Sequence, residues 1–195
     1  MVQVQASRRL HAGLSCVALL LLGALLSFAS IAAEPRFEIR NAFAEPVDGV
    51  WQLNAIVDLS LSRSAREALA EGIPLTLVLD ILISRERRFL PDDDVAELQQ
   101  RWQLDYDALS ERHVVTNLNS GAQSTYPSLD DALASLSMVR NLPMIDADLL
   151  EDGRRHEVSV RASVEIGGMP DTIKMLLFWR EWSRSTQWYT WSIRP

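Results

Sequence analysis

The chain has a single cysteine, Cys16, among its 195 residues. It lies in an apolar stretch that carries no charge from residue 12 to residue 33 and follows two arginines. We interpret residues 1–33 as a signal peptide that is cleaved after Ala32 or Ala33. No cysteine would then remain in the mature chain, which excludes disulfides, cysteine nucleophiles and thiolate metal sites from the exported part.

The same apolar stretch allows one alternative. Residues 14–33 are long enough to cross a bilayer as an uncleaved anchor. Cleavage is favoured because serine and alanine weaken the second half of the stretch. Either way, the sequence predicts that residues 34–195 form a single domain, exported to the periplasm by the general secretory route. If the signal is not cleaved, this domain is anchored in the inner membrane, and residues 14–33 are its only membrane contact.

Basic residues are too few for a nucleic-acid or lipid-binding surface. Without residues 1–33 the chain keeps 17 of its 19 Lys and Arg and all 26 Asp and Glu, a net charge of −9. Phosphate backbones and anionic head groups require a basic face. The exported domain is therefore predicted to bind no nucleic acid.

Side chains in catalytic or metal-binding patterns are also scarce. The mature chain has two histidines, His113 and His156, neither with a second ligand at metal-binding spacing. No glycine-rich phosphate loop, G-x-S-x-G elbow or H-E-x-x-H occurs. We predict no catalytic, cofactor-binding or metal residues. Enzymatic activity stays open, although the sequence favours its absence.

What the chain has in abundance is alternating apolar and polar residues. This pattern predicts a mainly β protein, an antiparallel β-sandwich that is immunoglobulin-like in general shape, with two short α-helices. The predicted strands cover residues 37–43, 53–61, 75–85, 102–106, 113–118, 123–126 and 158–166, with a β-prone tail at 188–193. The predicted helices cover residues 64–71 and 128–139, with one or two helical turns at 94–100. Alternate residues of three predicted strands are expected to face one shared core: Leu53, Ala55 and Val57; Leu77, Leu79 and Ile81; and Val158, Val160 and Ala162.

Tryptophans are concentrated at the C-terminus. Trp179, Trp182, Trp188 and Trp191 fall within thirteen residues. Such a cluster can stack on sugars, bind a protein or line a membrane interface, but closing the sandwich core is the more common role. The spacing of three turns Trp188 and Trp191 to opposite faces of a strand, and we expect Trp191 to be buried and Trp188 exposed.

Three arginines form the basic cluster of this acidic domain: Arg85, Arg87 and Arg88. They could bind an anion or an acidic partner. The more economical interpretation is the solvated end of a strand, paired with Glu86 and with the aspartates at 92–94. Together with Trp179, Trp182 and Trp188, the three arginines are the candidate binding surface.

Several segments resemble a known family. They are the Ala-Leu-Ala-Glu-Gly-Ile-Pro-Leu at 68–75, the Arg-Glu-Arg-Arg at 85–88, the Trp-Gln-Leu-Asp-Tyr-Asp-Ala-Leu-Ser at 102–110, the Ser-Leu-Asp-Asp-Ala-Leu at 128–133 and the tryptophans at 182, 188 and 191. Together they resemble a proteobacterial family of exported proteins, a domain of unknown function whose genes commonly lie beside a sensor kinase of the nitrogen-regulation type. The resemblance covers nearly all of the mature chain and implies a Gram-negative envelope setting.

These observations favour a non-catalytic periplasmic binding or accessory domain. Its expected partner is another envelope protein, and the resemblance points to a membrane sensor kinase in envelope signalling. The alternative is an envelope hydrolase, or a module that binds peptidoglycan or carbohydrate through the C-terminal tryptophans.

Overall fold

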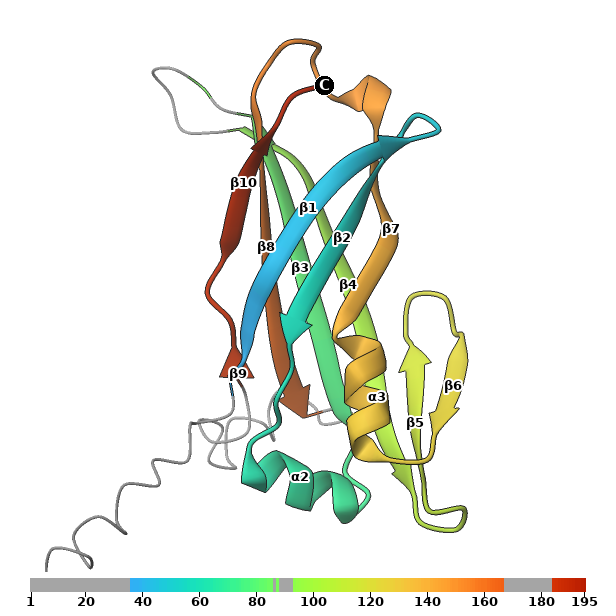
Figure 1. The fold of residues 1–195 in the computed structure, drawn as a ribbon. Coiled ribbons are helices and arrows are strands. Elements are labelled where there is room, and N and C mark those ends of the chain that lie inside the picture. Colours follow the sequence, from blue (N-terminus) through green and yellow to red (C-terminus); the bar gives the residue numbers. More distant parts are fainter. Residues whose placement is uncertain (1–35, 86, 88–92, 167–183) are drawn as a thin grey trace, which may run out of the picture. The chain divides into compact units, whose positions relative to one another are not determined.

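The computed structural model describes residues 36–85, 87, 93–166 and 184–195. Within them the chain is mainly β, with two antiparallel sheets packed together and two short helices, as the alternation predicts (Figure 1). The larger sheet has seven strands in the order β10-β8-β3-β4-β5-β6, with β9 also pairing with β8. Its strands are β3 (Leu75–Arg85), β4 (Asp93–Asp107), β5 (Arg112–Asn117), β6 (Gln123–Tyr126), β8 (His156–Ile166), β9 (Arg184–Ser185) and β10 (Tyr189–Ile193).

The smaller sheet covers one half of the larger one. It has the order β1-β2-β7, made of β1 (Glu38–Val47), β2 (Val50–Asp58) and β7 (Met138–Asp146). The other half is covered by α2 (Arg63–Ala70) and α3 (Leu129–Leu136), which lie below the small sheet in Figure 1. A short 3₁₀ helix, η1 (Ala147–Leu149), follows β7.

This division gives two clusters of buried side chains on the inner face of the large sheet. The first lies between the sheets and contains Leu53, Leu79 and Val160. The second lies under the helices and contains Leu69 and Leu133. The expected core residues of β2, β3 and β8 do share the first cluster, except for Leu77, which belongs to the second.

The helices are close to their predicted positions. Ser128 caps α3 by accepting a hydrogen bond from the amide of Asp131 at 3.1 Å, as predicted. In α2 the capping residue is Ser62, whose Oγ accepts from the Ala65 amide at 3.2 Å, so the helix begins at Arg63, one residue before the predicted start. The buried face of α2 holds Ala65, Ala68 and Leu69.

The prediction of helical turns at 94–100 is wrong. These residues form the first half of β4 and pair with β3, with Leu98 opposite Ile81 and Gln100 opposite Leu79. Alanine, leucine, glutamate and glutamine favour helices, but pairing with a buried neighbouring strand outweighs a local preference of a few tenths of a kcal/mol per residue. The aspartates at 93 and 94 therefore belong to a strand and cap no helix.

Two irregular strands differ from the sequence pattern. Residues 138–146 form β7, where the sequence predicts the end of a helix at Asn-Leu-Pro. Pro143 is tolerated there because β7 is the edge of its sheet. In β1 a bulge between Ile39 and Asn41 shifts the alternation, so that Ala42 is buried and Phe43 is exposed.

Candidate functional site

Trp188 projects from the outer edge of the large sheet because the chain makes a bulge there. Between the pairs Ser163–Ser185 and Val160–Tyr189, three residues of the edge segment face two of β8. Thr186 holds the bulge: its amide donates to the Ala162 carbonyl at 2.8 Å, and its hydroxyl oxygen accepts from the Ala162 amide at 3.1 Å. Thr186 is buried, whereas Trp188 is 44% exposed.

A row of polar side chains on the outer face of the sheet positions Trp188. The Arg161 guanidinium carbon lies 4.6 Å from the centre of the indole ring, within cation–π distance. Arg161 donates to the Asp80 carboxylate at 2.9 Å, and Gln99 donates to the same carboxylate at 2.8 Å. The row thus runs from the edge strand across β8 and β3 to β4. We call Trp188 and Arg161 with their support from Asp80 the Trp188 surface.

Trp191 behaves differently from Trp188, in the direction expected. It is half-buried on the inner side, packs against the first core cluster and lies 5.9 Å from the Tyr189 ring, measured between ring centres. Its indole nitrogen is buried and meets no hydrogen-bond acceptor in the described parts of the chain. Trp179 and Trp182 lie outside the described residues.

The arginine cluster is largely paired. Arg85 donates to Asp93 at 2.5 Å and also binds Glu151, while Arg87 binds Asp93. The hydrogen bond from Arg85, with the nearby charge of Arg87, lowers the pKa of Asp93 below its usual value. Arg88 lies outside the described residues. Acidic neighbours already balance these guanidinium groups. The structure therefore favours the interpretation of Arg85 and Arg87 as ion-paired residues at the end of a strand over an anion-binding site.

Among the predicted site residues that the structure describes, Trp188 and Arg85 lie apart. Along β8, Arg161 faces Asp80, whereas Arg85 faces His156, five positions further along both strands. Trp188 and Arg85 are therefore at separate places on the sheet. Sequence reasoning missed Arg161, since its partnership with Trp188 depends on the register of three strands that are distant in the sequence.

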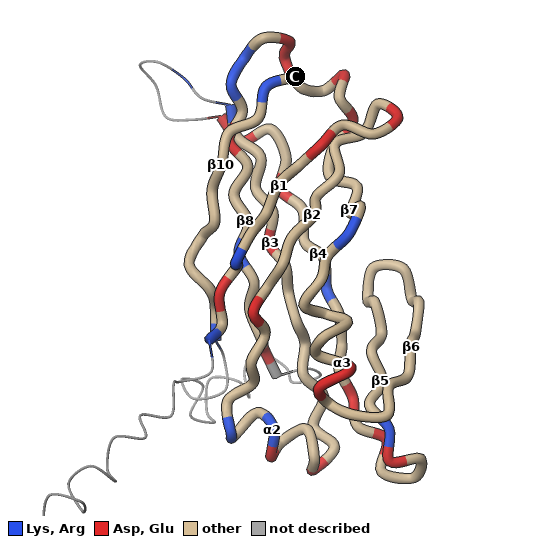
Figure 2. The backbone as a smooth tube through the Cα atoms, in the orientation of Figure 1, with Lys and Arg blue, Asp and Glu red and all other residues tan. Residues whose placement is uncertain are grey.

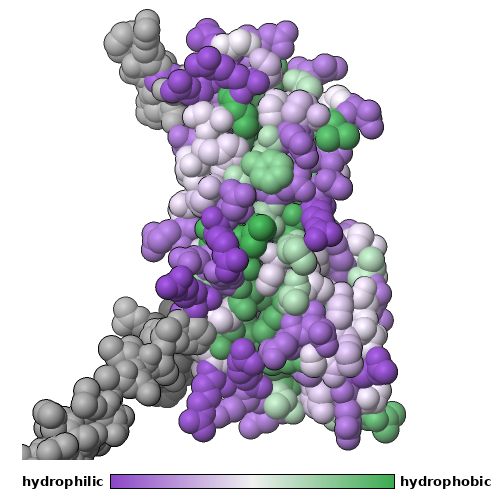
Figure 3. Space-filling view, in the orientation of Figure 1, coloured by the Kyte–Doolittle hydropathy of each residue, from purple (hydrophilic) through white to green (hydrophobic). Residues whose placement is uncertain are grey.

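Exposed apolar side chains mark the outer face of the small sheet. Phe43, Ile56 and Met138, one from each strand, are 47%, 42% and 48% exposed. Ile56 is directly opposite Met138, and the three side chains line a shallow hollow of about 230 Å³. Figure 3 shows hydrophobic atoms running down this face. The bulge in β1 that turns Phe43 outward is the feature that the sequence pattern did not show.

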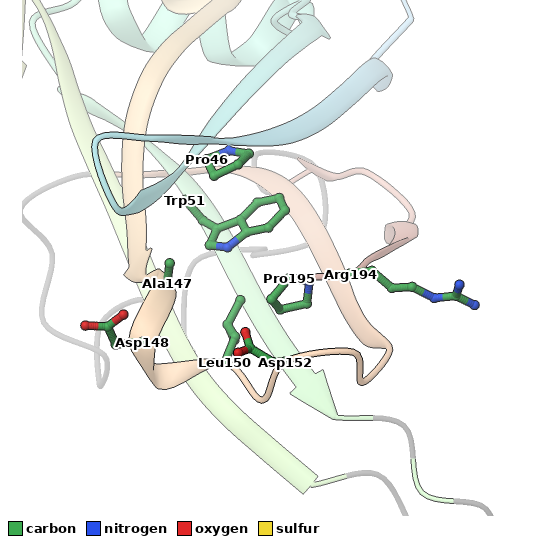
Figure 4. A pocket seen from close by; sticks show the side chains of 8 residues that line it. All are labelled: Pro46, Trp51, Ala147, Asp148, Leu150, Asp152, Arg194 and Pro195. Atoms are coloured by element: carbon green, nitrogen blue, oxygen red, sulfur yellow. The ribbon is translucent and has the colours of Figure 1, made fainter.

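A larger cavity, of about 610 Å³, lies where the start of β2 meets the last residues of the chain. Trp51 is at its centre, between Pro46 on one side and Leu150 and Pro195 on the other (Figure 4). Trp51 is 6% exposed, and its indole nitrogen has no acceptor among the described residues. The charged Asp148, Asp152 and Arg194 complete the lining.

The two histidines lie at opposite ends of the large sheet. His113 faces Tyr106 near the end of β4, and their ring centres are 5.1 Å apart. His156 is 1% exposed and faces Arg85, which in turn faces the start of β4 at Asp93. Within the described ranges, no group of three or more His, Cys, Asp or Glu side chains could hold a metal ion. The described residues also contain no helix of sufficient length and hydrophobicity to cross a membrane.

A protein-family model matches residues 34–192, which is nearly all of the chain after the apolar stretch. No curated protein and no solved structure matches the chain.

Proposed function

Because the chain belongs to the DUF4390 family, a domain of unknown function, over residues 34–192, we propose a function from the surface itself: a non-catalytic exported domain that binds another envelope protein. The observation that carries the proposal is the Trp188 surface. Tryptophan and arginine are the residue types most enriched among those that dominate the energy of protein interfaces. Arg161 and Asp80 hold Trp188 in one place before any partner arrives, which lowers the entropy cost of binding.

The proposed partner is the extracytoplasmic part of a membrane sensor kinase. Support for this choice is the family resemblance, which implies such a kinase as genetic neighbour and a Gram-negative envelope as setting. The domain would act as an accessory protein in envelope signalling. Its acidic charge makes a partner with a basic docking face the most favourable electrostatically.

Partner capture tests this function. Purified domain fixed on beads is incubated with a periplasmic and membrane extract, and retained proteins are identified by mass spectrometry. We expect the wild type to retain one envelope protein and Trp188→Ala to lose it. Phe43→Ala is the matched control, because Phe43 is an aromatic residue of similar exposure on the other sheet. Equal capture by all three proteins would contradict the role of the Trp188 surface.

A second candidate function follows from the exposure of the same ring. One face of an exposed indole can stack on a sugar, so Trp188 also suits a module that binds peptidoglycan or another carbohydrate. Pelleting with purified peptidoglycan separates the two functions. Co-sedimentation that Trp188→Ala abolishes, with no envelope protein retained, would favour the carbohydrate module.

Export is part of the proposal and rests on residues 1–33, which lie outside the described residues. We propose that these residues are a cleaved signal peptide and that the domain works in the periplasm. Fractionation of cells producing the full chain should place the domain outside the cytoplasm, with an N-terminus at residue 33 or 34 by mass spectrometry. An intact N-terminus in the membrane fraction would mean that residues 14–33 are an anchor, and a cytoplasmic product would contradict export.

A further inference from the structure

The first half of β4 has a partner strand on one side only among the residues that the structure describes. β3 pairs with β4 from Asp93 to Leu104 on one side, whereas β5 on the other side reaches only the segment from Trp102 to Asp107. Just beyond β5, the Asn119 side chain takes the place of a strand. It accepts from the Arg101 amide at 2.8 Å and donates to the Gln99 carbonyl at 2.9 Å. Asn119 thus closes this short stretch of the edge.

Further along, no strand among the described residues pairs with this edge. The carbonyl of Arg101 also bonds outward, to the Leu118 amide, so the odd-numbered residues here direct their backbone groups away from β3. The next groups in this alternation are the amide of Gln99 and the amide and carbonyl of Glu97. No described residue bonds them outside the β3 ladder. A bulge in β4 between Asp94 and Ala96 interrupts the pairing with β3, so the regular part of this edge runs from Ala96 to Gln99, about 10 Å, enough to pair with three or four residues of an added strand.

An apolar groove runs beside this edge. It has a volume of about 500 Å³ and separates the start of β4 from β7. Its lining is apolar except for Asp146: Val50, Val95, Ala96, Leu98, Pro143, Met144, Ile145 and Leu149. On the opposite side of the sandwich β1 packs against β8 and β10, so the two sheets are in contact there. On the side of the groove, β4 and β7 are separated. Every second side chain of an added strand would enter this groove.

Acidic side chains lie on both sides of this edge. Asp94 and Glu97 are exposed on β4, where Glu97 shares the outer face of the sheet with Gln99, and Asp146 and Asp148 are exposed across the groove, near the end of the sandwich where Figure 2 shows several acidic positions. A second copy of this acidic chain would bring like charges against these side chains. An occupant with basic side chains next to its apolar ones is favoured instead.

We propose that this groove binds an extended segment of a partner protein, with alternating apolar and basic side chains, by strand addition to β4. Backbone hydrogen bonds to Glu97 and Gln99 supply a sequence-independent part of the affinity, and the groove and these acidic side chains supply the specificity. Pro143 removes a donor from the β7 edge, so β4 is the strand that pairs. The inference rests on the proposed function in so far as the ligand is a protein, but it uses the edge of β4 and the groove instead of Trp188, and the two sites meet at Gln99, whose side chain donates to Asp80.

The test uses a model peptide of seven residues, acetyl-Lys-Val-Lys-Val-Lys-Val-Lys-amide. Its control has the same composition with the valines grouped at one end, which keeps the charge and removes the alternation. Amide hydrogen exchange of the exported domain is followed by NMR with and without each peptide. We expect saturating alternating peptide to slow exchange of the Glu97 and Gln99 amides at least about tenfold, and the grouped peptide to have little effect.

Two variants locate the binding site. Ala96→Trp fills the groove and should abolish binding, while Ala122→Trp, in the exposed β5–β6 turn, should not. Glu97→Lys keeps the fold in any case, because the side chain is exposed, and should weaken binding about fivefold by reversing an acidic charge beside the edge. Glu71→Lys makes the same charge change on an exposed residue at the end of α2 and should bind as the wild type does.

Three results would overturn the proposal. One is equal binding by Glu97→Lys and Glu71→Lys, and another is protection that appears on the outer face of the small sheet instead of at Glu97 and Gln99. The third is protection of Glu97 and Gln99 without peptide that grows with protein concentration, which would make a second copy the occupant. If partner capture still depends on Trp188 while the peptide fails, the strand-addition site is wrong and the proposed function stands.

Discussion

At the scale of single residues, backbone irregularities decide which side chains reach the solvent. Thr186 replaces a backbone acceptor with its hydroxyl oxygen, and the resulting bulge turns Trp188 outward. The bulge after Ile39 turns Phe43 outward in the same way. Because a shift of one residue exchanges the two faces of a strand, a bulge can turn a core residue of the sequence pattern into a surface residue.

The contrast between Trp188 and Trp191 predicts different stability effects. Trp191→Ala should lower the free energy of unfolding by about 2–3 kcal/mol, because a half-buried ring leaves the core. Trp188→Ala should cost less than about 1 kcal/mol, because it removes an exposed ring and one cation–π contact. Urea denaturation of the two single variants measures both values. A larger loss for Trp188→Ala would show that the face assignment is reversed.

His113 predicts a pH effect. Burial lowers the pKa of His113 below its usual value of 6.5. In the unfolded chain this histidine gains a proton as the pH falls through about 6.5, while in the folded chain it stays neutral to a lower pH. Its contribution to stability is thus present above pH 6.5 and is lost as the pH falls toward the folded pKa.

The measurement is urea denaturation between pH 7.5 and about pH 5, with His113→Gln as the comparison. The fall in the free energy of unfolding over this range should be smaller in His113→Gln. NMR titration of the wild type should place the His113 midpoint below 6.5. An equal slope in both proteins, with a midpoint at or above 6.5, would mean that burial does not control this group.

At the scale of elements, the sequence predicts best the strands that alternate over many residues. The apolar residues of β3 and the alternation of apolar and polar residues in β8 are enough to predict both strands from the sequence. Ser128 likewise marks the start of α3. The first half of β4 and the whole of β7 could not be predicted in this way. Their strand form depends on pairing with β3 and β2, which are distant in the sequence, and outweighs local helix and turn preferences.

The position of β3 at the centre of both cores gives a prediction. Leu79 is 2% exposed, so Leu79→Asp buries an unpaired carboxylate and should prevent folding, since the cost of several kcal/mol approaches the stability of the domain. Ile56→Asp is the control, because Ile56 is 42% exposed on the outer face of β2. Circular dichroism and thermal melting distinguish the two. A soluble Leu79→Asp variant that melts cooperatively would contradict the strand assignment.

At the scale of the whole molecule, the candidate site was only partly predictable. The spacing of the last two tryptophans predicts that Trp188 is exposed, and the acidic neighbours of Arg85 predict that it is paired. Two features depend on how strands that are distant in the sequence align. They are the contact of Arg161 with Trp188 and Asp80, and the open edge of β4. The sequence gives the residues, but the register of the strand pairs decides which of them lie next to one another on the surface.

The two proposals place two partner-binding surfaces on the large sheet: the Trp188 surface on its outer face and the edge of β4. A partner that reaches both would contact a single sheet. Binding at two points on a single rigid body would strengthen an interaction that each surface alone makes weakly.

The central claim, that the domain binds an envelope protein through its Trp188 surface, is tested most directly by photo-crosslinking in living cells. A benzophenone amino acid replaces Trp188 in the full chain, with the same replacement at Phe43 as the control. The account predicts a crosslink from position 188 to a single envelope protein and none to that protein from position 43. No crosslink from position 188, or the same crosslink from both positions, would contradict it.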